Sequence, residues 1–375
     1  MELEFTDEQE ELRTSVRSFL EKECSLDLVR AVVESGEPAD LLWESMVALD
    51  WPALAVPEEY GGVGLSIVET AVVVEELGRA VAPGPLLPTL TQFVPMVREV
   101  GTEDQRRTFL SGVASGTVAG AVALNDHPLG SSVDQVTMTA ERAEGGWVLD
   151  GTKLAVMAPE GVSEVIVVAR AKGGVGAFVV PAAEAGLVRM RSLDDSRPLC
   201  TAVLTQVMVP DDRALGDPGS AESDRGIRRA VEEATLGVAL ETVGACDALF
   251  QLVLAYVKDR KQFGVPVGSF QAIKHKMTDM FLSVERARSL CYFAVAAVEE
   301  DTLDRPVAVS MANAASDDCQ HLVCGESLQS FGGIGFTWEH DCHLFMKRAE
   351  TDGALFGGSA QHSLAVAGAY GVFDA

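Results

Sequence analysis

The sequence predicts an α+β protein made of three consecutive blocks, which are helical, β and helical again. Two observations predict this class. Apolar residues recur at helical spacing in the first and last parts of the chain, whereas short β-branched runs separated by Gly, Pro, Asp and Ser fill the middle. The chain has 375 residues, more than one core usually organises, so the blocks are expected to be separate domains.

Residues 1–115 are expected to form an N-terminal helical domain. Thr6 and Gln9 have the spacing of a capping box ahead of an apolar stripe, and Ser66 and Glu69 have the same spacing before the run IVETAVVVEEL. In a capping box the two side chains satisfy backbone groups that the first helical turn leaves free. Each pair therefore predicts the start of a helix.

The other two domains are predicted from a change in the spacing at which apolar residues recur. Residues 116–226 contain strand-sized runs such as EVIVVAR and GAFVVP at regular spacing, which predicts a small β sandwich or barrel. Residues 227–375 return to long helical segments, which are expected to pack as an antiparallel bundle. These helices are expected over residues 227–257, 269–300 and 305–330.

Composition excludes several classes of protein. The net charge is −27, so phosphate backbones and anionic lipid surfaces would repel the chain. We find no basic patch of any size and no uncharged apolar run of membrane-spanning length, so neither nucleic acid nor a membrane is expected as a partner. The acidic first residues do not resemble a secretory signal, and the seven Cys form no C-x-x-C pair. We expect a cytoplasmic protein with reduced thiols and no metal site.

Four segments are candidates for chemistry. Glycines at 332, 333 and 335 allow the backbone to turn sharply and approach a ligand, and Arg260 and Gln329 suit a phosphate or an amide group. Each segment taken alone is better explained as a turn between helices. The segments are PEEYGGVGLS (57–66), DRKQFGVPVGSFQAIKHKMTDM (259–280), LQSFGGIGFTWEHDCHLF (328–345) and LFGGSAQHSLAVAG (355–368).

Taken together and in this order, these segments resemble the acyl-CoA dehydrogenase family over nearly the whole chain. The motifs R-x-x-F-G, F-Q-x-x-x-H-K and Q-x-F-G-G-x-G-F carry the resemblance, at 260–264, 270–276 and 329–336. The resemblance implies an N-terminal helical domain, a middle β domain and a C-terminal four-helix bundle. It also implies an FAD enzyme that removes two hydrogens across Cα and Cβ of an acyl-CoA, with a glutamate as the base and flavin N5 as hydride acceptor.

The resemblance assigns part of an FAD site to matching residues. In the family, the motif residues at the end of the bundle hold the diphosphate and adenosine of an FAD that is bound mainly to the neighbouring subunit. Residues of the E-G-T-x-x-Q segment also lie near FAD, and Ser359 and Gln361 stand at those positions. The cofactor residues implied are Arg260, Phe263, Gln271, Gln329, Gly332, Gly333, Ser359 and Gln361.

The catalytic base does not match the family pattern. The usual Tyr-Glu-Gly-Thr reads Phe356-Gly357-Gly358-Ser359, so Gly357, which has no side chain to take a proton, stands at the glutamate position. A minority of the family, resembling isovaleryl-CoA dehydrogenase, carries the glutamate on the first bundle helix, where this chain has Ala234. Glu233 is the fallback base, although one helical position rotates a side chain by about 100°.

The positions around the flavin ring also depart from the family. The T-E-P-x-A-G-S-D loop reads Asn125–Ser132, and the W-I-T segment reads Ala155-Val156-Met157, without the aromatic plate or the hydroxyl donor. Methionine sulfur is only a weak acceptor. We expect a degraded flavin-ring pocket in this chain. His340 and His343 could suggest a metal site, but a role at a helix start is expected instead.

These features predict a subunit that works with a partner. Bacterial acyl-CoA dehydrogenases that this chain resembles occur as α2β2 heterotetramers, particularly in actinobacterial steroid side-chain degradation, and one subunit supplies the base. We expect this chain to supply the other half of the FAD site to a homologous catalytic subunit, with an acyl-CoA substrate and an electron-transfer flavoprotein as acceptor. Three alternatives remain open: a self-sufficient homotetramer that uses Glu233, a flavin-dependent oxygenase, and a flavin-free structural paralogue.

Overall fold

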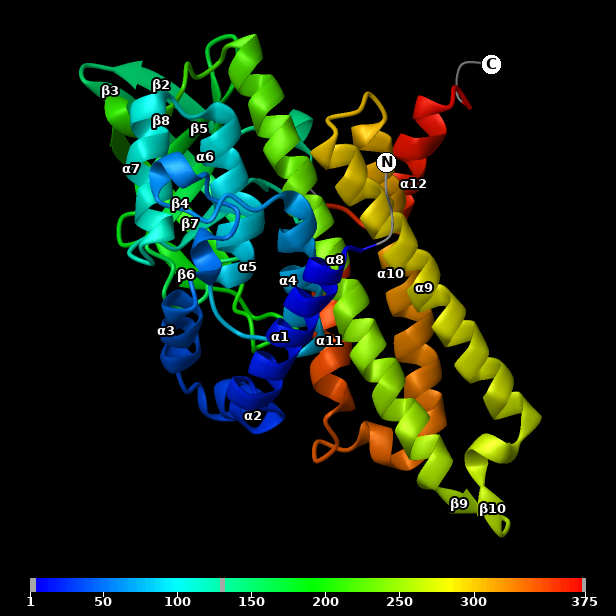
Figure 1. The fold of residues 1–375 in the computed structure, drawn as a ribbon. Coiled ribbons are helices and arrows are strands. Elements are labelled where there is room, and N and C mark those ends of the chain that lie inside the picture. The colour runs from blue at the N-terminus through cyan, green and yellow to red at the C-terminus, as the bar shows by residue number, and fades with distance from the viewer. Residues whose placement is uncertain (1–4, 129–131, 373–375) are drawn as a thin grey trace.

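The computed structural model describes residues 5–128 and 132–372, and they form three parts (Figure 1). The long helix α8 (Ala221–Asp259) runs through the middle of the molecule. The β part, in cyan and green, lies on one side of α8, and the other long bundle helices, in yellow and orange, lie on the opposite side. This arrangement confirms the predicted α+β architecture.

The N-terminal part is helical. Both predicted capping boxes are present, because Thr6 and Ser66 each exchange the two expected hydrogen bonds with Gln9 and Glu69. A π-helical turn (Thr89–Phe93) links two of the short helices. The helices are α1 (Asp7–Glu23), α2 (Leu26–Ser35), α3 (Asp40–Ala48), α4 (Ile67–Arg79), α5 (Leu86–Pro88), α6 (Val94–Val100) and α7 (Glu103–Ala114).

The middle part is one bent mixed sheet with the strand order β6-β7-β3-β2-β4-β5-β8, and β1 pairs with β4 in parallel. A single residue pair joins β2 to β4, and inward apolar side chains from both halves form one cluster, so the halves enclose a small core as in a sandwich. The strands are β1 (Gly120–Ala123), β2 (Thr139–Ala143), β3 (Gly146–Val156), β4 (Glu164–Ala171), β5 (Gly174–Pro181), β6 (Leu187–Arg189), β7 (Cys200–Pro210) and β8 (Ala214–Leu215).

The C-terminal part is the predicted bundle, and its first helix begins a few residues earlier than the periodicity indicated. Helices α8 and α10 both pack against α9 and α11, and α12 lies on α10. Besides α8, the elements are the hairpin β9 (Lys261–Gln262) and β10 (Val265–Pro266) and the helices α9 (Gln271–Glu299), α10 (Arg305–Phe331), α11 (Cys342–Gly353) and α12 (Ser359–Ala369).

Glycines let α4 and α8 cross in direct backbone contact. A Cβ on Gly244 would lie 1.9 Å from the carbonyl oxygen of Glu75, and one on Gly78 would lie 2.0 Å from that of Glu241. Helix α8 contains an 18-residue window with a mean hydropathy of 1.6, but 67% of that window is buried inside the protein. The apolar character of α8 is therefore that of a core helix. All seven Cys are buried and free.

Candidate functional site

Two of the predicted cofactor residues lie where α8 turns into the β9–β10 hairpin, at the free end of the bundle (Figure 1). Arg260 ends α8, and its backbone N–H donates to the carbonyl of Tyr256 at 2.8 Å. Phe263 stands at the tip of the hairpin with 92% of its surface exposed. Its φ of 52° and the φ of 84° at Gly264 close this tight turn. Gln271 is the exposed first residue of α9.

A second segment contributes the remaining motif residues. Gln329 is exposed on the last turn of α10, and Gly332 and Gly333 follow in the 3₁₀ turn Gly332–Phe336. Gly332 has a φ of 64°, which favours glycine. No atom lies within 4 Å of a Cβ placed on either glycine, so the backbone there is open to a ligand. We call Arg260, Phe263, Gln271, Gln329, Gly332 and Gly333 the clamp surface.

Three residues of the clamp surface, Arg260, Phe263 and Gln271, lie in a basic segment of an acidic protein. Between residues 258 and 276 there are five Lys and Arg and a single Asp, although the whole chain has a charge of −27. Among the described residues no carboxylate forms an ion pair with Arg260, so its guanidinium is available to an anion. Lys276 of this segment pairs with Glu326, so the excess of positive charge lies chiefly around Arg260. The basic residues are Lys258, Arg260, Lys261, Lys274 and Lys276.

Ser359 and Gln361 lie elsewhere, in the first turn of α12. The backbone N–H of Ser359 donates to Asp317 at 2.7 Å, and its hydroxyl donates to Asp318 at 2.9 Å. Gln329 is eleven residues farther along α10 than Asp318, a distance of about 17 Å at 1.5 Å per residue. The predicted cofactor residues therefore form two separate groups, and only the first group makes up the clamp surface.

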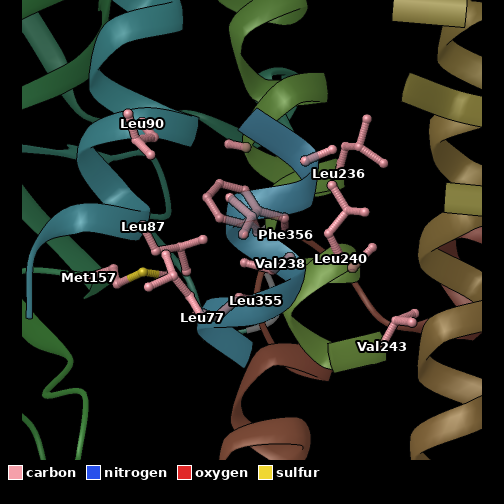
Figure 2. Packing of buried hydrophobic residues seen from close by; sticks show 14 of the residues in the cluster. Leu77, Leu87, Leu90, Met157, Leu236, Val238, Leu240, Val243, Leu355 and Phe356 are labelled. Carbon is pink, nitrogen blue, oxygen red and sulfur yellow. The ribbon is translucent and has the colours of Figure 1, made fainter. Parts of the chain in front are cut away.

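Gly357, the position expected of the base, lies in a buried segment beside Leu355 and Phe356 of the hydrophobic core. Gly357 is buried and has a φ of 101°, and its neighbour Phe356 is 8% exposed with a φ of 54°. Figure 2 shows the Phe356 ring among buried side chains from α8. A separate cavity of about 20 Å³, enough for one water molecule, is lined by Leu236, Leu240 and Glu233, and neither Phe356 nor Gly357 lines it.

Placing a glutamate at Gly357 is therefore expected not to create a working base. The Gly357→Glu change forces a side chain into a left-handed backbone position and should lower the free energy of unfolding by about 1–3 kcal/mol. Urea denaturation measures this loss, and Gly358→Ala is the matched control because its Cβ would meet Asp317 at an ordinary 3.5 Å. Bleaching of the flavin by an acyl-CoA with the variant chain alone would contradict the expectation.

The second possible base position, Ala234, is buried in α8. Ala234 is 2% exposed, and Thr235 donates to the carbonyl of Val231 at 2.7 Å. The Glu233 carboxylate accepts from Arg98 at 2.5 Å and from Arg305 at 3.3 Å. Two guanidinium groups thus hold the one acidic side chain that could serve as a fallback. It faces a cleft of about 470 Å³ lined largely by charged residues.

The flavin-ring positions point into the protein core. Met157 is 1% exposed and lies beside Leu77 and Leu87 (Figure 2), and its sulfur accepts from the Gln92 amide at 3.6 Å. Val156 is buried in the β core, and the part-buried Ala155 has no ring, so this segment offers no aromatic side chain to stack on a flavin. In the neighbouring loop Asn125–Ser132, residues 129–131 lie outside the described residues.

A buried ion pair fixes the start of that loop. Lys153 is fully buried, and its ammonium pairs with Asp126 at 2.7 Å and donates to the carbonyl of Leu124 at 2.9 Å. Burial lowers the pKa of Lys153 to about 8, and the charge of Asp126 opposes this shift. Asp126 also accepts from the backbone N–H of Met138 at 3.0 Å, so its side chain is used in holding the loop.

A buried network of charges escaped the sequence analysis. Arg348 donates to Asp194 at 2.6 Å and to Glu241 at 2.8 Å, and Arg197 pairs with Glu241 and Asp352. All five residues are at most 2% exposed. Burial disfavours the charge on Arg348, but Asp194 and Glu241 outweigh it and hold its pKa above the usual value. The network joins the β part to α8 and α11, and its members are too far apart in sequence to form a local pattern.

The predicted helix start at His340 is confirmed. The Nδ1 of His340 accepts from the backbone N–H of Cys342 at 3.1 Å, and Cys342 is the first residue of α11. The His343 ring stacks on Trp338 with ring centres 4.4 Å apart. Within the described ranges no group of His, Cys, Asp and Glu is arranged to hold a metal ion.

Comparison with known proteins gives the family. The descriptions "Acyl-CoA dehydrogenase, N-terminal domain" and "Acyl-CoA dehydrogenase, C-terminal domain" match residues 6–117 and 225–370. Acyl-CoA dehydrogenase IpdE2 of Mycobacterium tuberculosis is 30% identical over 356 residues, which cover 93% of each chain. The solved steroid ACAD Tcur3481-Tcur3483 is 28% identical with a TM-score of 0.85, covering 96% of this chain and 97% of that one. The ChsE4-ChsE5 complex of Mycobacterium tuberculosis shares the fold, with a TM-score of 0.88 at 21% identity and full coverage of both chains. This chain therefore belongs to the acyl-CoA dehydrogenase family.

Proposed function

We propose that this chain is the non-catalytic subunit of an FAD-dependent acyl-CoA dehydrogenase and that its clamp surface completes the FAD site of a homologous catalytic subunit. One contrast carries the proposal. The clamp surface is open and carries the exposed Arg260, whereas Gly357 and Ala234, at the two base positions, and Met157, at a flavin-ring position, are buried. A chain that had lost flavin altogether would have no need to keep an unpaired arginine beside an open glycine turn.

The clamp residues suit the diphosphate and adenosine of FAD. A guanidinium binds a phosphate with two parallel hydrogen bonds, so Arg260 is the residue expected to hold the diphosphate. The open backbone at Gly332 and Gly333 permits close approach of the dinucleotide, and the exposed Phe263 ring offers an apolar face. When bound, the flavin supplies hydride acceptance, and the α-proton base would come from the partner.

The substrate of the complex is expected to be an acyl-CoA thioester, and we extend this to a steroid side-chain CoA. The solved steroid enzyme reported above, at 28% identity over nearly the whole chain, supports the extension. The two-protein ChsE4-ChsE5 complex, which has the same fold, supports a heteromeric assembly. An electron-transfer flavoprotein is the acceptor that the family resemblance implies.

Substitution of Glu233 separates this proposal from a self-sufficient enzyme. In the complex with the catalytic partner, Glu233→Gln is expected to leave the rate of flavin reduction by substrate unchanged, because its carboxylate is held by Arg98 and Arg305. Removal of a true general base lowers the rate by about 10²–10⁴-fold. Stopped-flow reduction measures the rate, and Glu232→Gln on the same turn is the matched control. A loss of that size for Glu233→Gln alone would make Glu233 the base and overturn the proposal.

A further inference from the structure

Three aromatic rings lie at the base of the clamp surface. Tyr256 is on the last turns of α8, Phe331 is the last residue of α10, and His340 precedes α11. The ring centres of Tyr256 and Phe331 are 5.2 Å apart, and those of Phe331 and His340 are 4.4 Å apart. The ring planes in the two pairs are tilted by 60° and 55°, and we call this row of three tilted rings the stack. Phe331 is 3% exposed, so the middle ring of the stack is held by packing.

The clamp surface has two arms: the arginine arm contains Arg260, Phe263 and Gln271, and the glycine arm contains Gln329, Gly332 and Gly333. Both arms are attached to this stack. The hydroxyl of Tyr256 donates to the carbonyl of Phe331 at 3.3 Å, and the carbonyl of Tyr256 accepts the N–H of Arg260 at 2.8 Å. Gly332 follows Phe331 directly along the chain. A shift of either outer ring would therefore change the distance between the arginine arm and the glycine arm.

The third ring fixes the far side of the glycine turn. The Nδ1 of His340 accepts from the backbone of Cys342, and the Cys342 thiol donates to the carbonyl of Gly335 at 3.5 Å. The charged groups that face His340 are Arg30 from α2 and its neighbour Asp341, which pair with each other at 2.7 Å. Burial lowers the pKa of His340 below its usual value, so the ring is neutral and able to accept at neutral pH.

We infer that the Tyr256–Phe331–His340 stack sets the spacing between the two arms of the clamp surface, with Tyr256 and His340 as positioning residues for FAD binding. The inference rests on the proposed function. Neither residue needs to touch the cofactor, because each acts through Phe331 and the turn that follows it. Acidification should loosen the clamp surface, because a protonated His340 Nδ1 cannot accept from Cys342, and the attraction of Asp341 for the charged ring does not restore that hydrogen bond.

FAD binding by the purified complex with the catalytic partner tests the stack. Tyr256→Phe removes only the hydroxyl and should raise the Kd for FAD by about threefold to tenfold, and Tyr256→Leu should raise it by about tenfold or more. Tyr292→Phe is the control, because its hydroxyl bonds to Glu75 in another part of the bundle. This control should reduce thermal stability without changing FAD affinity.

The pH profile supplies a readout that general destabilisation would not give. Because burial lowers the pKa of His340, the Kd for FAD should stay level at neutral pH and rise only as the pH falls below the usual histidine range. His340→Asn, which keeps a neutral cap, should flatten that rise. Two results would overturn the positioning role of the stack, provided that Arg260→Ala still weakens FAD binding. One is wild-type FAD affinity in both Tyr256 variants, and the other is an unchanged pH profile of the Kd for His340→Asn. If Arg260→Ala also leaves affinity unchanged, the proposed function itself is wrong.

Discussion

Replacing Arg260 with alanine is expected to remove most of the FAD from the complex with the catalytic partner. The substitution deletes a charged donor for the diphosphate and leaves the fold intact, because Arg260 is exposed and bonds to the rest of the chain through its backbone. The loss of such a contact weakens binding by about 1.5–3 kcal/mol, or about 10-fold to 150-fold in Kd. Titration of the apo complex with FAD, followed by the fluorescence of unbound FAD, measures this change in Kd.

Arg107→Ala is the matched control for that measurement. Arg107 is also exposed and on a helix, but it pairs with Glu103 in the N-terminal part, far along the chain from the clamp surface. Surface pairs of this kind contribute about 0–1 kcal/mol to stability, and no effect on FAD is expected. Equal FAD affinity in the Arg260 and Arg107 variants would contradict the role assigned to the clamp surface.

Replacing Arg348 with alanine is expected to be the most destabilising single change in the chain. Arg348 is fully buried and pairs with Asp194 and Glu241, so its removal takes away the ion pair of the buried Asp194 and leaves Glu241 paired with Arg197 alone. Breaking a buried pair in this way costs about 3–5 kcal/mol. Urea denaturation followed by circular dichroism should show the midpoint fall by a corresponding amount.

Arg189→Ala provides the contrast between buried and exposed pairing. Arg189 bonds to Asp195, next to Asp194 in the same loop, but both side chains are about half exposed. Its removal should cost about 0–1 kcal/mol. If the Arg348 and Arg189 variants unfold at the same urea concentration, the buried network does not stabilise the packing of the β part against the bundle.

The starts of α1 and α4 were predictable because neighbouring residues fix them, whereas α8 begins at Ala221, six residues before the expected start. Thr6 and Ser66 begin helices through side chains three positions away, and the change of hydrophobic period separates the β part from the bundle. The residues of the clamp surface could be named in advance because they lie in three short motifs. The basic segment around Arg260 was visible in the sequence but was obscured by the charge of the whole chain.

The interior around Gly357 could not be predicted from local pattern. The sequence shows that a glutamate is missing, but only the folded chain brings Phe356 among the α8 side chains and closes the space. The same holds for Arg348 and Glu241, which are 107 residues apart and read as ordinary charged positions on helices. Contacts of this kind are created by tertiary packing, so a single sequence carries no periodic signal for them.

The flavin content of the chain purified alone, compared with the chain co-purified with a homologous subunit that carries the glutamate, tests the central claim most directly. Visible absorbance gives the number of FAD molecules per chain in each sample. The account predicts no flavin on the chain alone and one FAD per pair of chains in the complex. One FAD per chain in the sample purified alone would contradict the account and establish a self-sufficient flavoprotein.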